Sequence, residues 1–193
     1  LSAEWAEEHL APLVAGADAI IISDYAKGVV TTDLIRQVQR LAGPGKLVAL
    51  DPKPRPGISF RGLGLITPNR AEALLLARLA GVGAGDEFPA GKVCRRIHAL
   101  HAPDLLVVTL GPEGMLICRE GKVERHVPTA ARAVFDVSGA GDTVIAVLTA
   151  ALAARADPRR AVQLANLAAG VVVAKVGTAT AAPEEILRHG GSA

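Results

Sequence analysis

The chain has 193 residues, of which 50% are hydrophobic, and its 21 Lys and Arg nearly balance its 19 Asp and Glu. This length and apolar content are enough to bury one sizeable core, so we expect one domain or a large part of one. The small charge excess and the aromatic content of 3% exclude a basic nucleic-acid groove lined with base-stacking side chains.

The sequence also bears on membranes and compartment. The stretch from Val144 to Ala154, which is apolar except for Thr149, is too short to span a bilayer, and no signal-peptide pattern opens the chain. Cys94 and Cys118 stand alone without a CxxC pair, which favours a reducing compartment over a disulfide scaffold. We therefore predict a cytoplasmic protein without membrane or nucleic-acid partners. Because the chain starts at Leu1 rather than at Met, we expect it to be a piece of a longer protein.

The predicted elements alternate between strands and helices. Apolar runs that end in an acid, at 17–24 and 46–51, are typical of strands buried on both faces of a parallel sheet, and a helical pattern at 31–43 joins them. This alternation predicts a three-layer α/β fold with a mostly parallel central sheet flanked by helices. The further strands are predicted at 63–69, 104–111, 114–120, 121–127 and 131–137, and the further helices at 70–81, 87–101, 143–155, 158–176 and 183–189.

Ligands in such folds bind beyond the carboxyl ends of the strands. The tetrapeptide GAGD, which can serve such a site, occurs twice in the chain. The first copy, at 83–86, lies between two helical patterns and predicts a surface turn with Asp86 as a helix N-cap. The second copy, at 139–142, opens a helix that is apolar on all sides and has to be buried. Its first amides can bind a phosphate, and Asp142 can accept a proton from an alcohol. A buried helix with an Asp cap remains the alternative for this motif alone.

Three motifs together carry a family resemblance. The segment "DVSGAGDTVIAVL" resembles the C-terminal signature of the ribokinase-like, or PfkB, carbohydrate kinases, in which GAGD supplies an anion hole and the catalytic base. "TPNRAE" resembles the family's N-x-x-E element, which acts on magnesium through water and on nucleotide phosphates, and "TLGPEG" resembles its nucleotide loop. The resemblance implies catalytic roles for Asp142, Gly139, Ala140 and Gly141, and nucleotide-binding roles for Asn69, Glu72, Thr109, Gly111 and Gly114.

The resemblance implies a ribokinase-like fold and the transfer of phosphate from ATP, with Mg²⁺, to a sugar hydroxyl. Within the family, these motifs together with the segments "SDYAKGVV", "DPKP" and "ANLAAGVVVAKVGTAT" look most like those of heptose 7-phosphate kinases. Such kinases phosphorylate carbon 1 of the sugar for ADP-heptose synthesis. A kinase for another sugar or a nucleoside, and a nucleotide-binding chain without catalysis, remain alternatives. A homodimer stays open. The family's N-terminal sugar-binding signature and lid strands do not occur in 1–193, so we expect this chain to be the C-terminal, nucleotide-binding and catalytic portion of one kinase domain.

Other positions have a structural as well as a functional interpretation. Asn166 and Thr178 match places where family members line the adenine site, and a structural role is the alternative for each. Lys27 can reach a phosphate or be a solvated loop lysine. We interpret Asp24, Asp51 and Lys53 as residues that orient loops, and His98 and His101 as helix-end residues rather than a metal pair.

Overall fold

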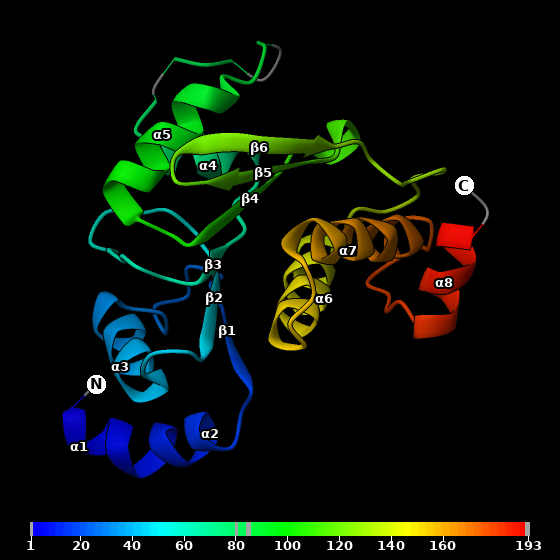
Figure 1. The fold of residues 1–193 in the computed structure, drawn as a ribbon. Coiled ribbons are helices and arrows are strands. Elements are labelled where there is room, and N and C mark those ends of the chain that lie inside the picture. Colours follow the sequence, from blue (N-terminus) through cyan, green and yellow to red (C-terminus); the bar gives the residue numbers. More distant parts are fainter. Residues whose placement is uncertain (1, 80, 84–85, 192–193) are drawn as a thin grey trace.

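The computed structural model describes residues 2–79, 81–83 and 86–191 and shows one six-stranded sheet between helical layers (Figure 1). The first four strands pair in parallel, and only the fifth strand, which pairs antiparallel with both of its neighbours, runs in the opposite direction. This confirms the predicted mostly parallel sheet. In spatial order, which is also chain order, the strands are β1 (Ala19–Ser23), β2 (Leu47–Asp51), β3 (Leu65–Ile66), β4 (Leu105–Thr109), β5 (Met115–Arg119) and β6 (Lys122–Val127).

Helices cover both faces of this sheet. The two core clusters assign α3 (Thr32–Ala42), α4 (Arg70–Leu76) and α5 (Ala90–His101) to one face, and α6 (Ala140–Ala153) and α7 (Pro158–Val173) to the other. The final helix, α8 (Pro183–Gly191), packs against α7. The three-layer architecture is therefore the predicted one.

The structure differs from the predicted elements at the N-terminus and at residues 131–137. Residues near the N-terminus, for which we predicted no element, form α1 (Ala3–Trp5), η1 (Ala6–Leu10) and α2 (Ala11–Ala15), and the last two contact α3. The predicted strand at 131–137 is wrong. There, the amides of Phe135 and Asp136 donate to the carbonyl oxygen of Val173, so this backbone is tied to the end of α7 instead of to the sheet.

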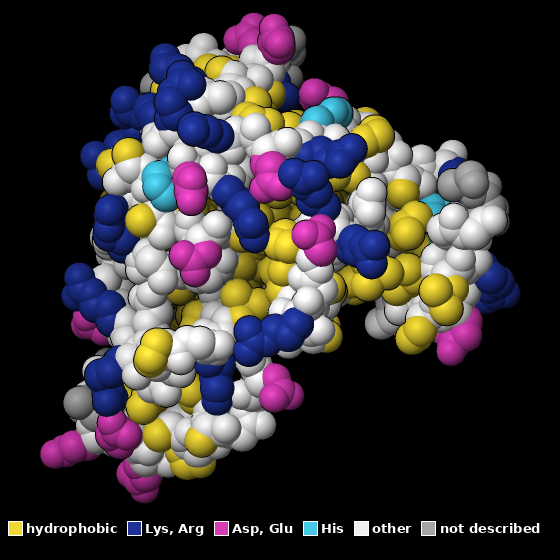
Figure 2. Space-filling view, in the orientation of Figure 1, with side chains coloured by type: hydrophobic (Ala, Val, Ile, Leu, Met, Phe, Trp, Pro, Cys, Tyr) yellow, Lys and Arg dark blue, Asp and Glu magenta, His cyan; other side chains and the backbone are white. Residues whose placement is uncertain are grey.

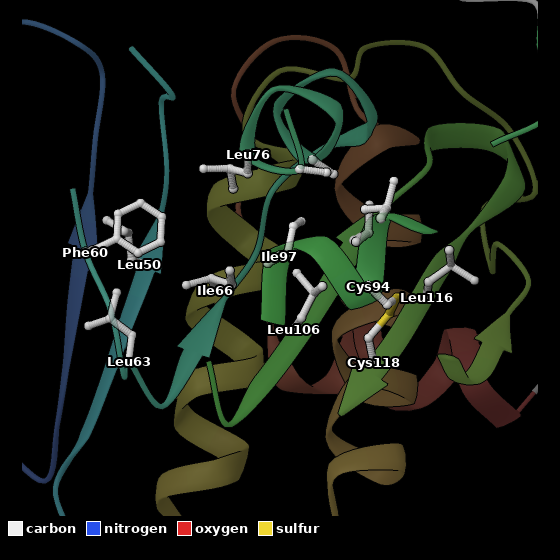
Figure 3. Close-up of a cluster of buried hydrophobic side chains, with 14 of the residues drawn as sticks. Leu50, Phe60, Leu63, Ile66, Leu76, Cys94, Ile97, Leu106, Leu116 and Cys118 are labelled. Atoms are coloured by element: carbon white, nitrogen blue, oxygen red, sulfur yellow. A yellow bond between two sulfur atoms is a disulfide. The ribbon is translucent and has the colours of Figure 1, made fainter. Parts of the chain in front are cut away.

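The core explains why the strands read as continuous apolar runs. In β4, Leu106 and Val108 point into the cluster under α3, α4 and α5, whereas Leu105 and Val107 point into the cluster under α6 and α7. Figure 3 shows Leu106 beside Ile97 of α5 in the first of these clusters. A strand buried on both faces needs apolar side chains at every position, and for this reason its sequence does not alternate.

The two cysteines form a disulfide, which contradicts our sequence-based interpretation of them as unpaired thiols (Figure 3). Cys94 lies on the inner face of α5 and Cys118 on β5, and their Cα atoms are 6.1 Å apart, within the usual range for a disulfide. The pairing depends on the packing of α5 against β5, a tertiary contact that the spacing of 24 residues does not reveal.

On the face drawn in Figure 2, basic and acidic side chains are interspersed, and hydrophobic side chains are visible in a central hollow. Within the described residues, no helix combines the length and the apolar character needed to cross a membrane.

Candidate active site

Two adjoining hollows lie at the carboxyl ends of the parallel strands. The larger is a cleft of about 720 Å³ whose wall includes Tyr25, Asp51, Lys53, Asn69 and Asp142. The smaller, of about 320 Å³, is mainly apolar and lies between the β4–β5 loop and helices α6 and α7. The two hollows share four wall residues, namely Thr109, Gly111, Val137 and Gly141. A ligand that fills both would therefore pass the N-terminus of α6.

The second GAGD forms the N-terminus of α6, as predicted. Gly139 is the N-cap with φ of 79°, a left-handed conformation that glycine adopts without strain. The amide of Ala140 donates to the carbonyl oxygen of Val137 over 3.2 Å, whereas those of Gly139 and Gly141 have no partner among the described residues. Asp142, in the first turn of the helix, is exposed to the cleft. The site thus joins an exposed carboxylate to amides that can bind an anion.

The first GAGD forms a different local structure. Ala84 and Gly85, like Ala80 nearby, lie outside the described residues. We predicted Asp86 as the N-cap of α5, and this prediction was wrong. The helix begins one turn later, with Pro89 as its N-cap. The carboxylate of Asp86 instead accepts a hydrogen bond of 2.7 Å from the amide of Gly83, which closes an exposed turn.

The N-x-x-E element caps α4 and faces the cleft. The Asn69 side chain accepts from the amide of Glu72 over 3.0 Å, and Glu72 Oε2 accepts from the amide of Asn69 over 2.8 Å, which is a reciprocal capping box. The second oxygen of Glu72 pairs with Lys53 Nζ, and Glu72 is only 7% exposed. Lys53 therefore belongs to the site itself, whereas we had interpreted it as a loop-orienting residue.

Both oxygens of Glu72 are thus engaged by the protein, and within the described residues no group of three or more His, Cys, Asp or Glu side chains can hold a metal ion. This arrangement fits an ion that keeps most of its water ligands and binds substrate phosphates, as Mg²⁺ does, rather than an ion held in a protein cage. Asn69 and Glu72 would act on such an ion through water.

A third acid, Asp51, ends β2 and lines the same cleft. Burial raises the pKa of its carboxyl from 3.8 to about 6, helped by the charges of Glu72 and Asp142 and opposed by that of Lys53. Partial burial acts to lower the pKa of Lys53, but its hydrogen bond to Glu72 and the charge of that carboxylate raise it overall. The cleft is therefore a coupled cluster of three carboxylates around one ammonium group.

We expect Asp51→Asn to remove a decline in stability with pH. The folded protein holds the Asp51 proton more tightly than the unfolded chain does. The stabilisation that comes from the protonated carboxyl is therefore fully present below pH 3.8 and is lost as the pH rises through about 6. Urea-unfolding midpoints between about pH 4 and about pH 7 should fall more steeply in the wild type than in Asp51→Asn. Asp33→Asn, at an exposed acid on α3, is the control. Parallel pH profiles of wild type and Asp51→Asn would contradict the assignment.

The loop after β4 is tied to the N-x-x-E element. The amide of Thr109 donates to the carbonyl oxygen of Pro68 over 3.0 Å, and Asn69 and Thr109 form an isolated parallel bridge. The loop then turns through η2 (Gly111–Glu113) to Gly114, whose φ is 93°. A Cβ atom at Gly114 would lie 2.1 Å from the carbonyl oxygen of Val127, so only glycine fits there. The structure thus brings Thr109, Gly111 and Gly114 to the smaller hollow, beside the predicted catalytic residues.

Asn166 lines the smaller hollow, but its side chain is occupied by the protein. It is 6% exposed, its Nδ2 donates to the carbonyl oxygen of Pro128 over 2.7 Å, and its Oδ1 accepts from the amide of Ala130 over 3.4 Å. Asn166 therefore holds the segment that follows β6. Thr178 lies elsewhere, beside the N-cap of α6, since a Cβ on Gly139 would be 3.4 Å from Thr178 Cγ2.

We expect Asn166→Ala to lower the free energy of unfolding by about 1–3 kcal/mol, because it removes the two hydrogen bonds that this buried amide makes to the 128–130 segment. Chemical unfolding measures this directly. Gln163→Ala, at an exposed position on the same helix, is the matched control and should be nearly neutral. Equal effects of the two substitutions would show that Asn166 does not hold this segment.

Lys27 is the one phosphate candidate that the structure does not bring to the cleft. It is exposed on the loop after β1 and lines neither hollow. On the same loop, sequence reasoning missed Tyr25, whose hydroxyl donates to Asp142 Oδ1 over 2.8 Å. It also missed Arg55, which pairs with the buried Asp24. Both residues lie on loops that follow strands, Tyr25 after β1 and Arg55 after β2, and this position is the signal in the sequence that could have identified them.

A further hollow, of about 460 Å³, lies at the opposite edge of the sheet and is lined in part by Lys46, Arg119 and Arg155. None of the predicted site residues reaches it. The candidate site is therefore the pair of hollows at the carboxyl edge, where all three sequence motifs meet.

Comparison with known proteins agrees with this geometry. The profile of the pfkB family carbohydrate kinase matches residues 1–185. The chain belongs to this family. Its predicted ribokinase-like fold is confirmed by solved structures, among them a ribokinase from Giardia lamblia, with a TM-score of 0.79 and 19% identity over 100% of this chain and 64% of that one. A ribokinase from Thermotoga maritima has a TM-score of 0.76 and 22% identity over 94% of this chain and 59% of that one.

Closer sequence relatives are longer proteins. The bifunctional protein HldE of Caulobacter sp. (strain K31) is 46% identical over 179 residues, which are 90% of this chain and 36% of the relative. The bifunctional protein HldE of Pelobacter propionicus is 42% identical over 177 residues, which are 89% of this chain and 35% of the relative. The chain therefore spans about a third of the length of the curated relatives that it matches.

Proposed function

We propose that the chain carries the nucleotide-binding and catalytic portion of an ATP-dependent sugar kinase, spanning residues 1–193, which transfers the γ-phosphate of ATP to a sugar hydroxyl. The observation that carries this proposal is the position of Asp142 and Gly141, where a mainly apolar hollow of about 320 Å³ meets a cleft of about 720 Å³. The first has the size of a pocket for a small organic ligand, and the second is lined by charged side chains. A donor and an acceptor bound in these hollows would meet at the N-terminus of α6.

In this mechanism Asp142 accepts the proton of the attacking sugar hydroxyl. The sugar oxygen forms a bond to the γ-phosphorus, the bond from that phosphorus to the bridging oxygen breaks, and ADP leaves. The free amides of Gly139 and Gly141 donate to the transferring group as its charge moves, and Ala140 completes the turn that aims them. Magnesium, when bound, supplies positive charge to the phosphate oxygens. Asn69 and Glu72 would hold it through water, and Lys53 balances the charge of Glu72.

The nucleotide would lie along the loop from Thr109 to Gly114, with its base in the smaller hollow. A solved ribokinase from Arabidopsis thaliana, described as complexed with ribose and ATP, has a TM-score of 0.74 to this chain and supports the choice of donor. Asn166 would shape the base pocket through the 128–130 segment, and Thr178 would lie near the phosphates rather than the base.

As acceptor we propose heptose 7-phosphate, phosphorylated at carbon 1. The sequence resemblance to heptose 7-phosphate kinases and the identity of 42% and 46% to bifunctional proteins named HldE support this choice. The alternatives are another sugar, a sugar phosphate or a nucleoside, and a nucleotide-binding chain without catalysis. A cytoplasmic location, a homodimer and a phosphate contact by Lys27 remain predictions from the sequence.

The deciding experiment measures ADP release by the chain with Mg-ATP and a panel of acceptors that includes heptose 7-phosphate, ribose, fructose and adenosine. Nucleotide binding is measured in parallel by calorimetry. Release that depends on one acceptor supports the kinase and identifies its substrate. Nucleotide binding without release on any acceptor would support the non-catalytic alternative. Absence of both would overturn the proposal.

A further inference from the structure

We propose that Tyr25 is a positioning residue for Asp142: its hydroxyl holds one oxygen of the carboxylate, so that the other oxygen is presented to the acceptor hydroxyl. This inference rests on the proposed kinase function, in which Asp142 is the base. Tyr25 belongs to none of the three sequence motifs, and 117 residues separate it from Asp142 along the chain.

The hydrogen bonds to Asp142 are one-sided. Tyr25 Oη donates to Oδ1 over 2.8 Å, and Ser23 Oγ makes a longer contact of 3.5 Å with the same oxygen. Among the described residues, these are the side-chain hydrogen bonds that reach this carboxylate, and neither ends at Oδ2. A hydroxyl that donates to an ionised carboxylate makes a strong, directional bond. The Tyr25 contact therefore fixes the rotation of the carboxylate and leaves Oδ2 to accept a proton.

The loop that carries Tyr25 is fixed by contacts of Asp24 and Arg55. Asp24, which is 2% exposed, accepts a hydrogen bond of 2.8 Å from the amide of Ala26 and forms an ion pair with Arg55. Arg55 also donates to the carbonyl oxygen of Val30 over 2.7 Å, at the far end of the loop. Ala26 has φ of 56°, a left-handed conformation that is costly outside glycine and persists only where the surroundings impose it. Tyr25 is thus fixed at its backbone on both sides.

Stability alone does not explain this arrangement. The Tyr25 side chain is 59% exposed, so its ring buries little apolar surface. It lines the cleft together with Asp51 and Lys53. The only ammonium group on that wall, among the described residues, pairs with Glu72 rather than with Asp142. Asp142 is therefore oriented by the hydroxyl of Tyr25 and not by the ammonium group of Lys53.

The test is Tyr25→Phe in the full chain, which keeps the ring and removes only the hydroxyl. We expect kcat to fall by about tenfold, with the KM for ATP nearly unchanged and the melting temperature lowered by only about 2–4 °C, because one hydrogen bond is lost. In the Asp142→Asn background the same substitution should have no further effect on the residual turnover, because the carboxylate that it orients is already gone. Val29→Ala, at a side chain that is 74% exposed on the same loop, is the matched control and should leave kcat unchanged.

Each outcome decides the proposal. A kcat for Tyr25→Phe equal to that of the wild type would overturn it, and so would a full additional loss in the Asp142→Asn background. Failure of the proposed function is seen separately, as a wild type that turns over no acceptor. In that case the melting temperatures of the two single variants and the double variant are compared, and additive shifts would show that the hydroxyl and the carboxylate do not interact.

Discussion

Asp142→Asn is expected to reduce turnover by about 10²–10⁴-fold while nucleotide affinity stays nearly unchanged. The substitution keeps the size and polarity of the side chain but removes its capacity to accept the proton of the acceptor hydroxyl. Nucleotide affinity depends instead on the loop from Thr109 to Gly114 and on the smaller hollow, whose walls do not include Asp142. Steady-state kinetics and calorimetry on the same preparation separate the two quantities.

The chain supplies its own control for this experiment, because the same tetrapeptide occurs at 83–86. Asp86 closes an exposed turn through Gly83, and Asp86→Asn should leave turnover close to that of the wild type. A loss at Asp86 as large as at Asp142 would mean that the first GAGD belongs to the active site. Undiminished turnover in Asp142→Asn would remove the general-base role.

Arg55→Met is expected to lower the free energy of unfolding by about 3–5 kcal/mol, because it leaves the carboxylate of Asp24 buried without a countercharge. For a chain of this size, such a loss lowers the melting temperature by roughly 10 °C. The effect extends to the cleft, since Arg55 also donates to the carbonyl oxygens of Lys53 and Val30 and so joins the loops after β2 and β1. Thermal unfolding followed by circular dichroism measures the loss.

Arg36→Met is the matched control, since Arg36 pairs with Asp33 where the two side chains are 71% and 70% exposed, and should change stability by less than about 0.5 kcal/mol. The double variant Asp24→Asn with Arg55→Met should recover part of the loss, because the neutral amide needs no countercharge and can still accept from Ala26. A double variant less stable than Arg55→Met alone would show that the buried charge is not the cause.

The sequence predicts β2 and β4 well because burial on both faces leaves a local signal, whereas β1, which was also predicted to be buried on both faces, leaves Ile21 40% exposed. The apolar runs that become β1, β2 and β4 are each followed by a loop that contributes residues to the candidate site. The N-x-x-E spacing coincides with a capping box at the start of α4. A local signal also identifies the second GAGD, because it opens a helix that is apolar on all sides. The prediction that this helix is buried all round was wrong: α6 buries one face, through Val144, Ile145, Leu148 and Thr149, whereas Ala146 and Ala150 are exposed.

The remaining features depend on contacts between distant segments. The pairing of Cys94 with Cys118, the ion pair of Asp24 with Arg55 and the hydrogen bond of Tyr25 to Asp142 arise only when strands and helices pack. Asn166 lines the smaller hollow, but its hydrogen-bond partners are backbone atoms of a segment 36 and 38 residues earlier. No spacing rule along the chain identifies such partners.

The walls shared by the two hollows also set a thermodynamic constraint. Thr109, Gly111, Val137 and Gly141 border both, so a molecule bound in one hollow forms or displaces part of the boundary of the other. The free energies of binding of the two ligands are then coupled. By linkage, whatever factor the first ligand applies to the dissociation constant of the second, the second applies to that of the first. The order in which the ligands arrive can change the route of assembly, but not the affinity of the complete ternary complex.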